Sequence, residues 1–216
     1  MPPVSESAAA PPASPAARLF AALPDAVVSA TFLVVWIAPL ALGERAVRNA
    51  LLTMLVEFVL MHASGMLGGV AFDRQRPRAT RLTVLAGFTA FYGIFIAAFA
   101  LAFDALWPVA VFGWLILGKF AGVFARHGHA AGEARRMQAE WAASAACYVG
   151  GVFLTVMLPL PRLGMSQSLQ PAFGLTGSGV WVDEPHRVVA FGALYFATLA
   201  WMKWRARPPG RAELPS

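Results

Sequence analysis

The sequence carries little charge and almost no cysteine, and both shortages narrow the class of protein. Asp, Glu, Lys and Arg make up 13% of its 216 residues, against 58% hydrophobic residues. The mean hydropathy is +0.62. A soluble domain has roughly twice that share of charged residues, so the excess apolar surface is expected to face lipid. The single cysteine, Cys147, excludes an intrachain disulfide and a cysteine-based metal site.

Motifs of the common enzyme classes are also missing. The chain has no phosphate-binding loop, no G-x-S-x-G, no H-E-x-x-H and no GxGxxG. We assign no catalytic residue, expect no cofactor and lean against an enzyme. The net charge of +6 would suggest nucleic acid on a soluble domain. Here the basic residues fall in the gaps between apolar runs, so the expected partner is membrane lipid and not nucleic acid.

The apolar runs predict an all-α, polytopic helix bundle. Six of them approach the roughly 17 to 25 residues that a membrane crossing needs. They cover about 26–43, 50–72, 82–103, 105–125, 141–160 and 186–204. Residues 1–24 are rich in Ala, Pro and Ser and are expected to be disordered. A cleaved signal peptide competes with a retained first span, which we favour because the leader would be unusually long. A short basic tail, residues 206–216, ends the chain.

The distribution of basic residues predicts the orientation. Twelve Lys or Arg residues fall on one side of the expected membrane and four on the other. Because basic loops stay in the cytoplasm, both termini are expected inside a bacterial inner membrane. The cytoplasmic loop with Arg126, His127, His129, Arg135 and Arg136 is expected to touch anionic lipid head groups.

The run from Leu51 to Phe72 is expected to be the central helix, because it combines apolar length with polar and small residues. At 100° per residue, Glu57 shares a face with Gly68, while His62 lies about 140° round, near Gly65 and Gly69. Small residues mark close helix approaches in membranes. The expected packing positions are therefore Gly65, Gly68 and Gly69, together with Gly118 and Gly122 on the fourth run.

Glu57 and His62 are the candidate polar site, because ionisable side chains inside a span are costly and often functional. All three tyrosines, Tyr92, Tyr148 and Tyr195, are expected near mid-depth, where buried hydroxyls need partners. Each of them also fits a plain bond to a neighbouring carbonyl. Glu57 is equally compatible with a structural ion pair to Arg187.

Two ligand sites were weighed. Haem at His62 would need a second axial ligand at matching depth, and the remaining histidines lie near the membrane boundaries. Asp183, Glu184 and His186 offer oxygen and nitrogen metal ligands. The same segment suits a helix start, with Asp183 as cap and Pro185 in the first turn. We favour the helix start.

The sequence leaves three functions open. The first is movement of a proton, ion or small solute through a polar site around Glu57 and His62, opening outward. The second is a non-catalytic membrane subunit or assembly protein whose buried polar residues serve packing. The third is an outward-facing metal-dependent membrane enzyme.

Overall fold

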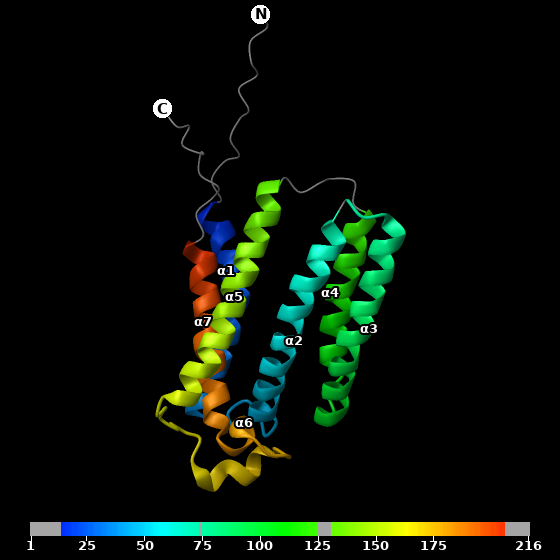
Figure 1. The fold of residues 1–216 in the computed structure, drawn as a ribbon. Coiled ribbons are helices and arrows are strands. Elements are labelled where there is room, and N and C mark those ends of the chain that lie inside the picture. The colour runs from blue at the N-terminus through cyan, green and yellow to red at the C-terminus, as the bar shows by residue number, and fades with distance from the viewer. Residues whose placement is uncertain (1–13, 74, 125–130, 206–216) are drawn as a thin grey trace, which may run out of the picture.

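The computed structural model describes residues 14–73, 75–124 and 131–205, which form helices and loops without a β-strand (Figure 1). The all-α prediction is confirmed. The long helices are α1 (Pro15–Ile37), α2 (Ala46–Phe72), α3 (Arg78–Phe103), α4 (Trp107–Phe124), α5 (Ala131–Met157) and α7 (Pro185–Arg205). A 3-10 helix, η1 (Gln167–Phe173), and the short α6 (Val180–Asp183) lie between α5 and α7.

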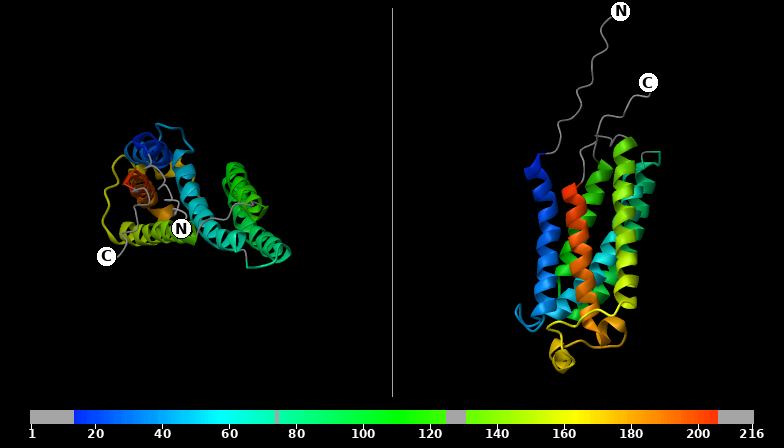
Figure 2. Two further views of the ribbon diagram at one scale, coloured as in Figure 1. Left: turned by 90° about the horizontal axis from the view of Figure 1, so that it is seen from above. Right: turned by 90° about the vertical axis from the view of Figure 1, so that its left-hand side faces the viewer.

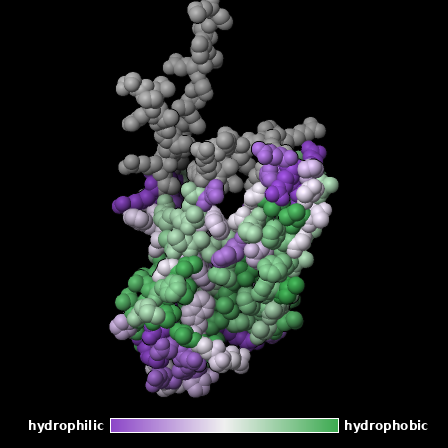
Figure 3. All heavy atoms as spheres, viewed as in Figure 1, coloured by the Kyte–Doolittle hydropathy of each residue, from purple (hydrophilic) through white to green (hydrophobic). Residues whose placement is uncertain are grey.

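Four of these helices are long and apolar enough to cross a membrane: Pro15–Ile37, Ala46–Ala71, Arg78–Phe103 and Gln138–Met157. A shorter apolar helix covers Trp107–Ala121. The surface agrees with a membrane setting, because the face in Figure 3 is apolar around its middle and polar at both ends. Exposed apolar side chains are frequent, with Leu101 83% exposed.

The first helix differs from its prediction, since it begins at Pro15 and ends at Ile37 instead of covering 26–43. Ser14 caps it by accepting a hydrogen bond from the Ala17 amide at 3.2 Å, and Pro15 stands in the first turn. Composition therefore misjudged residues 15–24, which are helical. Residues 1–13 and 206–216 lie outside the described residues.

The prediction that the second apolar run forms the central helix agrees with the structure. Half of the membrane-length window of α2 is buried, against 22% or less in the other three. It contacts α3 and α4 on one side and α1, α5 and α7 on the other. Viewed from above, α2 separates these two groups (Figure 2).

The tightest pair of helices is α1 and α7. The ring of Phe32 packs so closely on Gly192 that a Cβ there would lie 2.1 Å from a ring carbon. Ser29 donates its hydroxyl to the Ala193 carbonyl at 2.8 Å. The two helices are antiparallel, so α1 begins where α7 ends. We call this end of the bundle the terminal end.

The opposite end, called the loop end, is covered by residues 158–184. This connection lies on the bundle, because Met165 and Phe173 are buried in the core around α7. Trp36 donates its indole N–H to the Pro161 carbonyl at 3.0 Å, and Gly164 donates its amide to the Trp36 carbonyl at 3.2 Å. The loop end is consequently closed over the half of α7 that begins at Pro185.

Candidate functional site

Glu57 and Tyr195 meet in the middle of the bundle. The Tyr195 hydroxyl on α7 donates to Oε1 of Glu57 on α2 at 2.9 Å. Tyr195 is buried, and Glu57 is half-buried. A hydrogen bond to a carboxyl group inside a membrane bundle is costly to leave unmade. Of the three tyrosines considered as partners of buried polar groups, Tyr195 is the one that bonds Glu57.

Tyr148 lies beside this pair but bonds elsewhere. Its hydroxyl donates to the Met54 carbonyl at 2.7 Å. Its ring meets the Tyr195 ring edge-on, with 5.3 Å between centroids, and the Phe191 ring at 4.9 Å. The carbonyl-bonded alternative thus holds for Tyr148 and fails for Tyr195.

Two residues of the site were missed by sequence reasoning. Asp25 on α1 and Lys203 on α7 form an ion pair, with 2.5 Å between Oδ2 and Nζ. The Asp25 side chain is 13% exposed and that of Lys203 48%. The two residues extend the polar site from Glu57 toward the terminal end.

Helical spacing could have found this ion pair. Asp25 is four residues before Ser29, and both contact α7. Lys203 is eight residues after Tyr195, which places the two on one face of α7. The expected span began at residue 26, however, which put Asp25 at the membrane boundary instead of inside a helix.

His62 stands apart from the Glu57 pair. Its Nδ1 donates to the Phe58 carbonyl one turn back at 2.8 Å, and its ring stacks near Phe58 at 4.2 Å. In the neutral ring this bond leaves Nε2 as an acceptor. Among the described contacts, none joins His62 to Glu57. The structure therefore splits the expected Glu57–His62 site.

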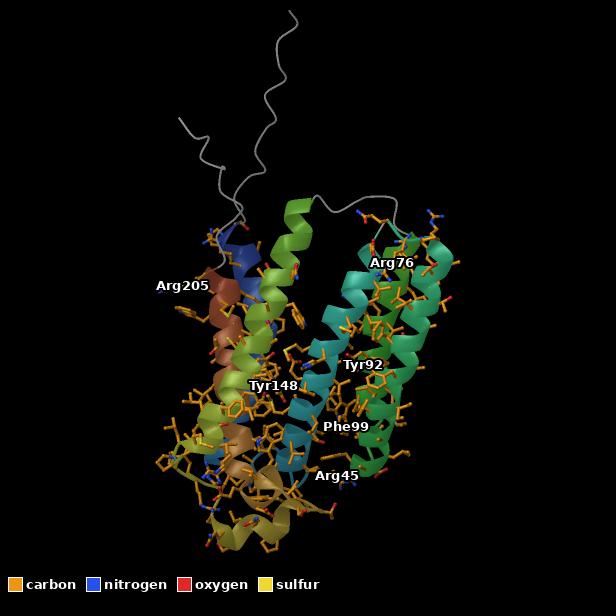
Figure 4. All side chains as sticks on the ribbon, viewed as in Figure 1. Arg45, Arg76, Tyr92, Phe99, Tyr148 and Arg205 are labelled. Atoms are coloured by element: carbon orange, nitrogen blue, oxygen red, sulfur yellow. The ribbon has the colours of Figure 1, made fainter. Side chains whose placement is uncertain are left out.

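Tyr92 also lies elsewhere, on the far side of α2 (Figure 4). Its ring packs against Phe91 at 5.2 Å and Phe88 at 6.4 Å, within the apolar cluster that α2 forms with α3 and α4. The expectation that it shares a site with Glu57 is corrected: its position on α3 points it into a different core.

The expected ion pair between Glu57 and Arg187 is corrected as well. Arg187 hydrogen-bonds Glu184 and donates to the carbonyls of Thr155, Val156 and Leu158 at 2.9, 2.7 and 3.0 Å. Thr155 and Val156 belong to the last turn of α5, whose final carbonyls have no partner inside the helix, and Leu158 directly follows that helix. Arg187 is held there and does not reach down to Glu57.

The side chains considered as metal ligands take part in the hydrogen bonds around Arg187 or next to them. Asp183 accepts from the Gly179 amide at 3.3 Å, and Glu184 accepts from Arg162 at 3.4 Å as well as from Arg187. The hydrogen bond from Arg187 is the main reason that the pKa of Glu184 lies below its ordinary value. Within the described ranges, no three His, Cys, Asp or Glu side chains are placed to hold a metal ion, so Asp183, Glu184 and His186 do not form such a site.

The glycines predicted to mark helix packing behave differently from one another. A Cβ on Gly65 would lie 2.4 Å from the Trp141 indole nitrogen, and one on Gly68 would lie 3.4 Å from Lys119 Nζ. Gly69 and Gly118 face open space within 4 Å, so their assignment to packing is corrected. The surroundings of Gly122 lie outside the described part of the chain.

Two further glycines mark close packing that the sequence analysis did not select. A Cβ on Gly151 of α5 would lie 2.6 Å from the Phe191 ring, and Gly192 receives the Phe32 ring. Both neighbours belong to the core around α7. Between the described helices, aromatic residues facing single glycines, not paired G-x-x-x-G spacing, mark the close contacts.

Comparisons with protein-family models, curated proteins and solved structures found no match to this chain. Function is therefore argued from the residues and their geometry.

Proposed function

We propose that the protein crosses a bacterial inner membrane six times and moves protons through Glu57. The helices α4 and α7 run beside the four helices of membrane-crossing length (Figure 1). The sequence places twelve of the basic residues on one side of the expected membrane, and those among them that the structure describes lie at the terminal end (Figure 1), which supports a cytoplasmic location for both termini. Reporter fusions after Gly164 and after Arg207 test this topology: outside and inside signals are expected, and an outside signal after Arg207 contradicts it.

The contact between Tyr195 and Glu57 is the observation that carries the proposal. A carboxyl group can take up and release a proton, and acidic groups inside membrane bundles mark proton relays. The 2.9 Å bond from Tyr195 fixes the position of that carboxyl between α2 and α7. The Asp25–Lys203 pair then continues the polar groups toward the terminal end, where Lys203 is 48% exposed.

Protons fit this site better than metal ions or larger solutes. Hard cations such as Ca²⁺ and Mg²⁺ need about six or more oxygen ligands. The Glu57 carboxyl has one hydrogen-bond partner among the described residues, Tyr195. A proton needs only one acceptor at each step. The pathway also has no wide opening at the loop end along α7, where the residues from His186 to Ala193 are buried apart from Arg187.

Reconstitution tests the proposed function. Purified protein in liposomes with an internal pH-sensitive dye is given a pH step and a compensating potassium pathway. Wild type should acidify the lumen faster than empty liposomes, and Glu57→Gln should fall to the leak of empty liposomes while keeping its thermal stability. Glutamine retains an oxygen that accepts from Tyr195, so the fold is expected to survive. Equal rates for wild type and Glu57→Gln would contradict proton movement through Glu57.

A non-catalytic membrane subunit is the second candidate, and the exposure of α5 favours it. Only 11% of its membrane-length window is buried, and Ala142, Ala146 and Gly150 are exposed along it. Small residues let a partner helix approach closely. Under this alternative, Glu57→Gln and wild type would show the same proton leak, and the protein would purify with a partner.

A further inference from the structure

A groove of about 280 Å³ lies between α1 and α2 in the half of the bundle nearer the loop end. Its polar lining comes from Thr31 on α1 and from Asn49 and Thr53 on α2, and Val28, Phe32 and Val35 supply much of its apolar wall. We propose that this groove is the water-filled access from the loop end to Glu57, a proposal that rests on the proposed proton movement.

The groove leads to Glu57 through the register of α2. Asn49, Thr53 and Glu57 are four residues apart, so each is turned by about 40° and raised by about 6 Å relative to the last. They form one polar stripe on a helix that is otherwise apolar along this length. The groove ends at Thr53, one turn from the carboxyl that Tyr195 holds.

The polar lining can hold water. Thr31 and Thr53 donate their hydroxyls to the Val27 and Asn49 carbonyls at 2.9 and 2.8 Å, which leaves lone pairs on both oxygens for water to donate to. The exposed Asn49 amide offers a donor and an acceptor. A cavity needs only about 10–15 Å³ of such space to hold one water molecule, so the groove has room for several.

With this groove, polar groups follow one another along most of the bundle. Asn49, Thr53 and Thr31 lead from the loop end to Glu57 and Tyr195. The Asp25–Lys203 pair leads from there to the terminal end. The first half is open to water and the second is held by an ion pair, so protons, and not hydrated ions, are the class of substrate that the whole path suits.

Cysteine accessibility tests the groove, because the chain has one native cysteine to remove. In a Cys147→Ser background that still moves protons, Asn49→Cys and Thr53→Cys are exposed in spheroplasts to a membrane-impermeant, cationic thiosulfonate. The cysteine thiolate attacks the sulfenyl sulfur of the reagent and displaces sulfinate, and a thiol ionises to the thiolate only where it contacts water. Ile94→Cys is the matched control: Ile94 is 69% exposed on the lipid-facing side of α3 at a similar distance from the loop end.

We expect both groove cysteines to react at least about tenfold faster than Ile94→Cys, following the thiolate fraction, and labelled Thr53→Cys to lose proton movement. A Thr53→Cys rate no higher than that of Ile94→Cys would overturn the groove proposal and indicate that lipid chains fill it. Labelling that leaves proton movement intact would also overturn it. If Glu57→Gln moves protons like wild type, the proposed function fails instead, whatever the labelling shows.

Discussion

The indole of Trp141 on α5 lies directly on Gly65 of α2. Its Nε1 donates to the Met61 carbonyl at 2.9 Å, and a Cβ on Gly65 would lie 2.4 Å from that same nitrogen. The hydrogen bond and the glycine therefore depend on each other, because any side chain at position 65 would displace the donor. Through this contact α5 packs on the central helix.

We expect Gly65→Ala to destabilise the protein. The added methyl group must push Trp141 away, an overpacking cost of about 1–3 kcal/mol, and the indole N–H loses its acceptor. Thermal unfolding in detergent, followed by tryptophan fluorescence, measures the change. Gly69→Ala is the control, one turn further along α2 with nothing within 4 Å. It should be neutral or stabilising, since alanine favours a helix by about 1 kcal/mol over glycine. Equal loss in both variants would mean that the Trp141 contact does not hold α5.

Much of this arrangement follows from the sequence, and the exceptions have physical reasons. The small and polar residues on two faces of α2 predicted its central position, and the depth of the three tyrosines made a bond to Glu57 one of two alternatives, beside a bond to a neighbouring carbonyl. Depth alone could not show which of Tyr92 and Tyr195 contacts Glu57. It gives the height of a residue in the membrane but not the direction in which its side chain points from the helix. Tyr92 consequently packs in the cluster of α2, α3 and α4.

The position of Arg187 was unpredictable for a different reason. Its long side chain can reach several partners, and the free carbonyls at the end of α5 come within reach of Arg187 only once residues 158–184 fold over the loop end. Asp25 was missed because the preceding Ala- and Pro-rich composition concealed where α1 begins. In both instances the partner of the charged side chain is set by tertiary contacts between segments that are far apart in the sequence.

The two tyrosines beside Glu57 should respond differently to loss of the hydroxyl. Each of Tyr195→Phe and Tyr148→Phe removes one hydrogen bond, with a net stability loss of about 0.5–1.5 kcal/mol. Only Tyr195 touches the carboxyl. We therefore expect Tyr195→Phe to slow dye-reported proton movement in liposomes and Tyr148→Phe to leave it near wild type. If both variants transported alike, the Tyr195 bond would be structural only.

The Asp25–Lys203 pair joins α1 to α7 and should show energetic coupling. A double-mutant cycle with Asp25→Asn, Lys203→Gln and the double variant isolates the pair in detergent unfolding. Because Lys203 is 48% exposed, solvent screens the pair, and we expect coupling of about 0.2–1 kcal/mol. Asp25→Asn should also slow proton movement, whereas Lys203→Arg keeps a cation and should transport. Strictly additive stability losses would show that the two charges do not stabilise each other.

The Glu184–Arg187 contact at the loop end should make stability depend on acid pH. The hydrogen bond from Arg187 lowers the pKa of Glu184, so the folded state favours the carboxylate. This contribution is fully present above the ordinary glutamate pKa of about 4.3 and is lost as pH falls through the lowered value. We expect the melting temperature of Glu184→Gln to fall less than that of wild type between neutral pH and pH 3.

Glu44 provides the matched control for this pH dependence, because it is an exposed acid in the α1–α2 loop at the same end. Glu44→Gln should keep the wild-type pH profile. Arg187→Gln should flatten the profile as Glu184→Gln does, and it should lower stability further at every pH, since the carbonyls of Thr155, Val156 and Leu158 lose their shared donor. A wild-type profile retained in Arg187→Gln would mean that the acid sensitivity of Glu184 comes from Arg162 instead, whose Nη2 lies 3.4 Å from Oε1 of Glu184.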